Sequence, residues 1–139
     1  AFNMALEKVL NLLSSEEDEI GTLVTQFERE EDLKKEQFVK AVCNLSSGET
    51  EAYAENFVRQ QRDYNVHNLF HHIGIYSFKR DALEKFVTLS QTYREKNEKL
   101  EQLRALDNNM KIKIGLIDFL PLGVDTPDDL EEIRKILSK

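Results

Sequence analysis

The sequence predicts an α/β domain in which helices flank a mixed sheet. Three observations support this prediction. Apolar stretches with the alternation or β-branched content of strands are separated by stretches in which apolar residues recur at helical spacing. Strands and helices alternate at both ends of the chain, with a hairpin predicted in the middle. The chain has 139 residues, of which 40% are hydrophobic, so we expect residues 1–139 to form a single domain with a modest core.

The first third of the chain predicts a helix followed by a buried strand. Over residues 3–14, apolar side chains recur at the i, i+3, i+4 and i+7 positions of one helix face. The stretch IGTLVTQF, residues 20–27, is apolar and rich in β-branched residues, as in a strand covered on both faces. The charged residues 28–37 fit either a short exposed helix or a loop.

The middle of the chain predicts a hairpin and an irregular connection. FVKAVCNL (residues 38–45) and TEAYAE (residues 50–55) have strand character, and the residues between them favour a turn near Gly48. Residues 55–68 show no clean period, and we expect them to form a loop. LFHHIGIYSF, residues 69–78, is the clearest strand of the sequence.

The last third of the chain predicts three helices and one strand. Residues 80–89 have the pattern of a short helix for which Asp81 is a candidate N-cap. Residues 94–107 form a second predicted helix, with leucines on its inner face. An alternating strand is predicted at residues 111–117, and helical spacing returns at residues 127–138.

Asp125 lies between the last predicted strand and the last predicted helix. Thr126 is a good N-cap, and Asp129 completes a Thr-x-x-Asp capping box. Pro127 suits the first helical position, so Asp125 directly precedes a helix N-terminus. In open α/β sheets, ligands bind beyond the carboxyl ends of the strands. Asp125 is therefore either a ligand-binding acid or an ordinary acidic residue near a helix start.

Two polar rings on the clearest strand form a candidate pocket. His72 and Tyr76 point to one face of the strand, and Gly74 leaves open space between them. The adjacent His71 and His72 point to opposite faces, so we do not expect them to bind one metal ion, and no zinc site is predicted. The alternative is that His72 and Tyr76 are half-buried side chains whose polar atoms are satisfied within the protein.

Glu101 and Gln102 are a further pair of candidate ligand-binding residues. They lie near the middle of the predicted helix over residues 94–107, where they offer hydrogen-bond acceptors and a donor. The same pattern is also that of an ordinary solvated helix face. The two interpretations stay open at the level of the sequence pattern.

Composition and charge exclude several classes of function. The 26 acidic and 19 basic residues give a net charge of −7, which argues against a nucleic-acid surface. No stretch is long and apolar enough to span a membrane, and no signal peptide is visible. Cys43 is the single cysteine, which is consistent with a reducing, cytoplasmic setting. The five glycines are isolated, so the sequence contains no P-loop or dinucleotide-binding motif.

Four segments together resemble one enzyme family. HHIGIYSFKRDALEKF, EKLEQLRALDNNMKIKI and PLGVDTPDDLEEIRKIL follow in the order and spacing of the C-terminal half of bacterial 3-deoxy-manno-octulosonate cytidylyltransferases. EIGTLVTQFEREEDLKKEQFVKAVCN resembles the segment before them, so the resemblance covers most of residues 19–138. It implies a fold like that of the nucleotide-diphospho-sugar transferases, with the N-terminal nucleotide-binding half absent from this sequence.

The resemblance implies a reaction and roles for particular residues. Such enzymes transfer CMP from CTP to 3-deoxy-manno-octulosonate for lipopolysaccharide biosynthesis, with Mg²⁺ as the cofactor. Asp125 would be one of two carboxylates that bind the catalytic Mg²⁺. His72 and Tyr76 would line the sugar pocket, and Glu101 and Gln102 would bind the sugar hydroxyls.

The resemblance also implies partners, and it includes departures from the family pattern. We expect a cytoplasmic homodimer whose CTP site lies on the missing half. Either another chain carries that half, or this sequence is a fragment of a longer one. Arg62 would keep one substrate-binding arginine, whereas another falls near Glu55 in an ungapped alignment, and an acid there would repel the sugar carboxylate. Two hypotheses follow: the chain is the sugar-binding portion of a cytidylyltransferase and inactive alone, or it is a diverged, non-catalytic dimerising module.

Overall fold

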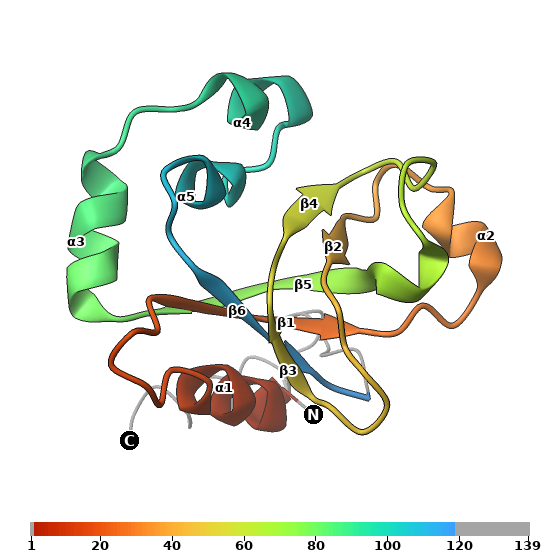
Figure 1. Ribbon diagram of the computed structural model, residues 1–139, viewed down its shortest axis with the longest axis horizontal. Coiled ribbons are helices and arrows are strands. Elements are labelled where there is room, and N and C mark those ends of the chain that lie inside the picture. The colour runs from red at the N-terminus through yellow and green to blue at the C-terminus, as the bar shows by residue number, and fades with distance from the viewer. Residues whose placement is uncertain (1, 119–139) are drawn as a thin grey trace, which may run out of the picture.

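The computed structural model describes residues 2–118, and the elements below belong to that part of the chain (Figure 1). The helices are α1 (Phe2–Asn11), α2 (Glu30–Leu33), α3 (Arg80–Thr88), α4 (Tyr93–Glu98) and α5 (Leu103–Asp107), with a 3₁₀ turn η1 (Val66–Asn68). The strands are β1 (Ile20–Thr25), β2 (Lys40–Val42), β3 (Glu51–Tyr53), β4 (Asn56–Val58), β5 (Leu69–Phe78) and β6 (Ile112–Leu116).

The strands form one mixed sheet in the order β3-β6-β1-β5-β2-β4. β1 and β6 run parallel, and the other neighbouring pairs are antiparallel. The outermost strands, β3 and β4, are joined directly by Ala54 and Glu55. Ala54 N–H donates to Ile112 O of β6, and Glu55 N–H donates to Val42 O of β2. The sheet therefore curls until its two ends meet at this link.

The two faces of the sheet carry separate cores, which confirms the predicted mixed sheet with flanking helices (Figure 1). α1 covers one face, where Val9 and Leu12 cluster with Leu23 of β1. α3 and α5 cover the opposite face over the larger cluster, which includes Phe86 and Leu103, and α4 packs against α5. All six residues of β1 are buried, as expected of a strand covered on both faces.

The predicted hairpin around Gly48 is wrong. Gly48 does lie in a turn, with a φ of 87°. However, β2 lies between β5 and β4, whereas β3 pairs with β6 at the other end of the strand order. The reason is burial: all three residues of β2 are buried between two partner strands, and an isolated hairpin would leave them half exposed.

Residues 55–68, predicted as a loop, contain β4 and η1. β4 pairs antiparallel with β2, and its central residue Phe57 is 1% exposed. A strand of three residues is too short for a period to appear in the sequence. Its pairing is decided by the neighbouring strand and by burial of Phe57, and this context-dependence is typical of β-structure.

The predicted helix over residues 94–107 is wrong as a single element. α4 begins with a capping box in which the side chains of Thr92 and Glu95 each accept a hydrogen bond from the other residue's N–H. It ends at Lys99, which has a left-handed φ of 59°, and α5 begins four residues later. Leu100 and Leu103 are buried as predicted, so the break redirects the chain without exposing them.

The remaining helix predictions have mixed outcomes. α1 agrees with the predicted helix over residues 3–14 but ends at Asn11. Asp81 is not the N-cap of α3, because Lys79 occupies that position with extended backbone and Asp81 lies in the first turn. There the carboxylate still favours the positive end of the helix dipole. The predicted helix over residues 127–138 lies outside the described residues.

Candidate functional site

β5 places His72 and Tyr76 on the same face of the sheet, as predicted. Their ring centroids lie 5.5 Å apart in an edge-to-face arrangement. β5 bulges opposite Thr22 of β1, where the register between the two strands shifts. A Cβ added at Gly74 would meet no atom within 4 Å, so the predicted open space is present.

Thr22 fixes the tautomer of His72, and burial keeps the ring neutral. Thr22 Oγ1 lies 2.9 Å from His72 Nε2 and 2.8 Å from Ile75 O. Because the hydroxyl has one proton and donates it to the carbonyl, it accepts the proton of Nε2. Burial lowers the pKa of His72 to about 4, and the neighbouring His71 acts in the same direction. His72 is therefore neutral at pH 7 and leaves Nδ1 as an acceptor.

A cleft of about 300 Å³ opens on this face, between β5 and helices α3 and α5. Tyr76 lines it from β5, and Glu101 and Gln102 line it from the α4–α5 connection. Its other walls are mainly apolar, with Ile20, Phe78, Leu83, Phe86, Val87, Ala105 and Ile112. Apolar walls with a few convergent polar groups are typical of a site for a small polar ligand.

Tyr76 and Glu101 give the cleft its hydrogen-bonding character. Burial raises the pKa of Tyr76, and the negative charge of Glu101 raises it further. The phenol therefore stays protonated and can donate or accept, while the Glu101 carboxylate accepts only. Gln102 can both donate and accept. His72 does not line the cleft but packs edge-on behind Tyr76.

A buried ion pair holds the α4–α5 connection in place. Arg104 donates to both carboxylate oxygens of Glu95, at 2.9 Å and 2.5 Å. The two side chains are 13% and 5% exposed. The hydrogen bonds from Arg104 hold the pKa of Glu95 below its usual value, against the opposing effect of burial. A bidentate pair of this kind fixes geometry as well as charge, so it positions Glu101 and Gln102.

Arg59 ties the same connection to the edge of the sheet. Its Nε donates to Glu98 O at 2.9 Å, and Nη2 donates to Lys99 O at 3.2 Å. Nη1 donates to Glu36 O at 3.2 Å, next to β2. These carbonyls include the last residue of α4, so Arg59 satisfies acceptors that the helix leaves unpaired at its C-terminus.

The sequence analysis missed the supporting residues Thr22, Arg59 and Arg104. Thr22 gave one signal, because it is polar in an otherwise apolar, doubly covered strand. The sequence contains no signal for the roles of Arg59 and Arg104, because their partners lie at sequence separations that match no helix or strand period.

Of the predicted site residues within the described part of the chain, His72 and Arg62 do not line the cleft. Arg62 is exposed between β4 and η1 and does not line it. Glu55, near the position of an expected arginine, is also exposed. Asp125 lies outside the described residues. Within residues 2–118, no group of three or more His, Cys, Asp or Glu is arranged to hold a metal ion. None of the helices in that range could cross a membrane.

The chain belongs to the cytidylyltransferase family, because the family model described as Cytidylyltransferase matches residues 3–112. The 3-deoxy-manno-octulosonate cytidylyltransferase of Paramagnetospirillum magneticum is 47% identical over 119 residues, which cover 86% of this chain and 48% of that protein. The protein of the same name from Rhizobium johnstonii is 46% identical over 129 residues, which cover 93% of this chain and 51% of that protein.

Comparison with solved structures gives the same family. A CMP:2-keto-3-deoxy-manno-octonic acid synthetase complexed with CTP matches with a TM-score of 0.71 and 25% identity. The match covers 97% of this chain and 56% of that chain. The chain therefore spans about half the length of the relatives that it matches.

Proposed function

We propose that this chain forms the sugar-acid-binding part of a cytidylyltransferase that transfers CMP from CTP to 3-deoxy-manno-octulosonate. The observation that carries the proposal is the cleft, where Tyr76 meets Glu101 and Gln102 although the two segments lie on different elements. The relatives named after this substrate support the choice of sugar acid. Because the chain spans about half of those relatives, the complete reaction requires the other half of the enzyme.

The cleft residues would bind the hydroxyl groups of the sugar. Glu101 accepts hydrogen bonds from hydroxyls, and its negative charge keeps the sugar's own carboxylate at a distance. Gln102 and the protonated Tyr76 phenol contribute donors and acceptors on two sides of the cleft. His72 positions the Tyr76 ring from behind. Arg62 is exposed and does not line the cleft, so its role in substrate binding stays a prediction.

In the reaction, a sugar hydroxyl attacks the α-phosphorus of CTP, and pyrophosphate leaves. The chain's own contribution is to hold the sugar so that this hydroxyl faces the nucleotide-binding half. When Mg²⁺ is bound, it offsets negative charge on the phosphate oxygens. By its resemblance to the family, we propose Asp125 as the metal-binding carboxylate of this chain. We further propose that the enzyme acts in the cytoplasm as a homodimer.

Calorimetry with 3-deoxy-manno-octulosonate tests the binding role of the cleft. We expect the chain to bind this sugar acid and Glu101→Gln to weaken binding about tenfold or more, since one charged hydrogen bond contributes on the order of 1.5–3 kcal/mol. Glu84→Gln on exposed α3 is the matched control and should leave affinity unchanged. Absence of binding by the unmodified chain favours the non-catalytic, dimerising alternative.

Pyrophosphate release tests the metal role. With CTP, Mg²⁺, the sugar acid and the nucleotide-binding half supplied, Asp125→Asn should abolish turnover and leave sugar binding intact. Turnover that is unchanged in Asp125→Asn removes this residue from the metal site.

A further inference from the structure

The register between β1 and β5 skips two residues of β5. Thr22 of β1 pairs with Tyr76, and the next residue of β1, Leu23, pairs with Ile73. Residues 74–75 of β5 therefore have no partner in β1. The result is a bulge that lengthens the path of β5 relative to β1.

The bulge decides how far apart His72 and Tyr76 lie. These residues are four positions apart in sequence, and in a regular strand that separation spans about 13 Å. Across the bulge, however, their partners in β1 are Val24 and Thr22, which are only two positions apart. Two positions of a strand span about 7 Å, which agrees with the 5.5 Å between the two ring centroids. The bulge therefore brings the two rings into contact.

The side chain of Thr22 bridges the bulge. Its Oγ1 lies 2.8 Å from Ile75 O and 3.2 Å from Ile73 O, on the two sides of Gly74. The same oxygen lies 2.9 Å from His72 Nε2. Thr22 is fully buried, so solvent does not compete for these hydrogen bonds. One hydroxyl therefore connects both sides of the bulge to the imidazole ring.

Gly74 is the alternative cause of the bulge. Glycine is required in a bulge where the backbone adopts a positive φ or where a side chain would meet other atoms. The φ of Gly74 lies outside the left-handed region, and a Cβ at this position would meet no atom within 4 Å. The bulge therefore does not depend on a missing side chain, whereas the contacts of Thr22 span it directly.

The His72 ring connects Thr22 to the cleft. It packs edge-on between two other rings, with centroids 4.9 Å from Phe57 of β4 and 5.5 Å from Tyr76. Because Nε2 is bound to Thr22, the ring cannot turn without breaking that hydrogen bond. Thr22 therefore acts on Tyr76 through this ring as well as through the backbone, although it does not line the cleft itself.

We propose that Thr22 is a positioning residue for sugar binding: by bridging the bulge of β5, it sets the spacing of His72 and Tyr76 and holds the Tyr76 hydroxyl in the cleft. This inference rests on the proposed function, which makes the cleft the sugar-acid site. A methyl group in place of the hydroxyl would release both the Ile75 carbonyl and the His72 ring. The Tyr76 hydroxyl would then lose its place beside the sugar.

Three variants of the full chain test this role. Thr22→Val removes the hydroxyl and keeps the size of the side chain, whereas Thr22→Ser keeps the hydroxyl. Ser77→Ala is the matched control, because it also removes a buried hydroxyl of the β1–β5 pair that donates to a backbone carbonyl. That acceptor is Val9 O, at 2.7 Å in α1 on the opposite face of the sheet. Thr22→Val and Ser77→Ala should both lower the urea midpoint.

Two measurements separate positioning from stability. In nuclear magnetic resonance, the unmodified chain, Thr22→Ser and Ser77→Ala should show Overhauser contacts between the His72 and Tyr76 rings, and Thr22→Val should lose them. In calorimetry with 3-deoxy-manno-octulosonate, Thr22→Val should bind at least about tenfold more weakly, which corresponds to the loss of one hydrogen bond from Tyr76. Thr22→Ser and Ser77→Ala should leave the affinity unchanged.

The remaining outcomes overturn the proposal. Ring contacts that survive in Thr22→Val reject the positioning role, and lost contacts with unchanged affinity show that the spacing does not matter to the sugar. An equal loss of affinity in Ser77→Ala assigns the effect to stability.

Two further results keep the test decisive. If Thr22→Val does not fold by circular dichroism, Thr22→Cys replaces it, since a thiol is only a weak donor and acceptor, and unchanged ring contacts in Thr22→Cys reject the role. Absence of sugar binding by the unmodified chain contradicts the proposed function. The ring contacts, which need no ligand, then decide separately whether Thr22 sets the spacing of the two rings.

Discussion

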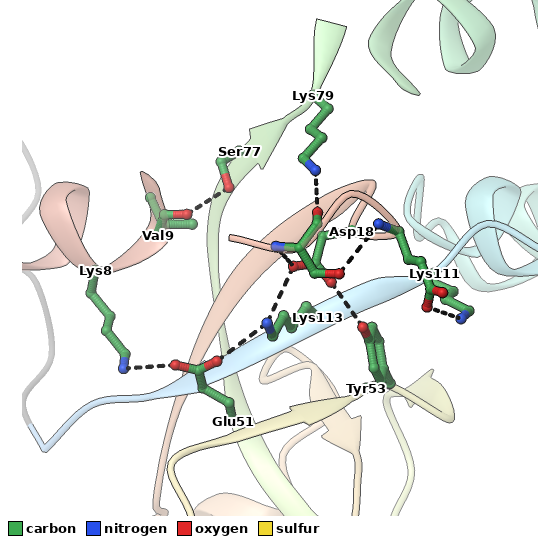
Figure 2. Close-up of polar contacts among 11 residues, drawn as sticks. Lys8, Val9, Asp18, Glu51, Tyr53, Ser77, Lys79, Lys111 and Lys113 are labelled. Atoms are coloured by element: carbon green, nitrogen blue, oxygen red, sulfur yellow. Dashed lines mark hydrogen bonds and ion pairs between the residues drawn. The ribbon is translucent and has the colours of Figure 1, made fainter. Parts of the chain in front are cut away.

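Two polar clusters, each centred on a buried carboxylate, lie on different sides of this molecule, and they differ in the sequence distance that they bridge. The cleft cluster consists of Thr92, Glu95 and Arg104, which lie within thirteen residues of one another. The sheet cluster consists of residues from α1, the loop before β1, β3 and β6: Lys8, Asp18, Glu51, Tyr53 and Lys113 (Figure 2). The cleft cluster holds one short segment, and the sheet cluster joins four.

The sheet cluster is centred on Asp18, whose side chain is fully buried. Figure 2 shows Tyr53 and Lys113 converging on its carboxylate, at 2.8 Å and 3.3 Å. Burial alone would raise the pKa of Asp18, but hydrogen bonds from Ser15 N–H, Tyr53 and Lys113 outweigh it and lower the pKa. Lys113 also pairs with Glu51 at 3.4 Å. This cluster therefore fastens β3 and β6 to the start of β1.

The comparison predicts that losing one cluster should have different consequences for binding and for stability from losing the other. Loss of the cleft cluster should affect the position of Glu101 and Gln102 more than the rest of the fold. Loss of the sheet cluster should destabilise the sheet more broadly, because its side chains reinforce the strand pairing and packing that join α1, β1, β3 and β6. The following changes test this difference in order of expected size.

Asp18→Ala should have the largest effect on stability. It leaves the buried Lys113 with Glu51 as its remaining partner, and removing one member of a buried ion pair costs about 3 kcal/mol. Urea denaturation measures this change. Glu17→Ala is the control, because Glu17 is 78% exposed and lies 3.9 Å from Lys111, so its loss should cost less than about 0.5 kcal/mol. Equal effects of the two variants would contradict the central role of Asp18.

Glu95→Gln should have a smaller effect on stability and a larger one on the cleft. The amide keeps the shape of the side chain but weakens both hydrogen bonds to Arg104, at a cost of about 1–3 kcal/mol. We expect sugar-acid binding, measured by calorimetry, to fall further in Glu95→Gln than in Asp18→Ala. The reverse order would contradict the inference that the cleft cluster positions the binding residues and the sheet cluster stabilises the fold.

Acid pH should weaken both clusters. The pKa values of Asp18 and Glu95 are lowered in the folded protein from ordinary values of 3.8 and 4.5. Each carboxylate therefore contributes stability above its unfolded pKa, and this contribution is lost as the pH falls through the lowered folded value. Urea midpoints measured from pH 6 to pH 2.5 should decline below about pH 4.5. Asp18→Asn and Glu95→Gln should each flatten that decline.

His72 should add a decline at higher pH. Its folded pKa is about 4, below the ordinary value of 6.5, so the unfolded chain binds a proton between these values and the folded chain does not. Stability from His72 should therefore fall as the pH drops from 6.5 towards 4. Nuclear magnetic resonance should show a neutral ring protonated on Nε2 at pH 6. A charged His72 ring at that pH would contradict the lowering of its pKa by burial.

Arg80→Ala should have the smallest effect. Arg80 and Glu84 form an exposed pair at 3.3 Å on α3, with side chains 90% and 66% exposed. Solvent and salt screen such a pair, so its loss should change the free energy of unfolding by less than about 0.5 kcal/mol. A larger change in urea denaturation would mean that α3 has contacts beyond the described residues.

The long periodic segments of this protein were predictable from its sequence, because periodicity reports burial directly. The pattern over residues 20–27 and 69–78 gave β1 and β5, and helical spacing gave α1 and α3. The shared face of His72 and Tyr76 followed from strand geometry alone. These features depend on neighbours along the chain, which the sequence displays.

The pairing of the short strands was decided by tertiary structure. Gly48 provides a turn, yet β2 is buried between β5 and β4, while β3 pairs with β6 at the other end of the strand order. The division of the predicted helix at Lys99 also depends on distant groups, since Arg59 binds the carbonyls exposed at the break. A local pattern contains no information about such partners.

The sequence by itself determined the α/β class and the family resemblance, and it singled out Tyr76, Glu101 and Gln102, because these depend on residue order and local period. Only the tertiary structure brought Tyr76 to Glu101 and Gln102 in one cleft and tied Asp18 to Lys113. The physical reason is that burial and hydrogen bonding between distant segments are settled when the chain packs, and many sequences with the same local pattern would pack differently.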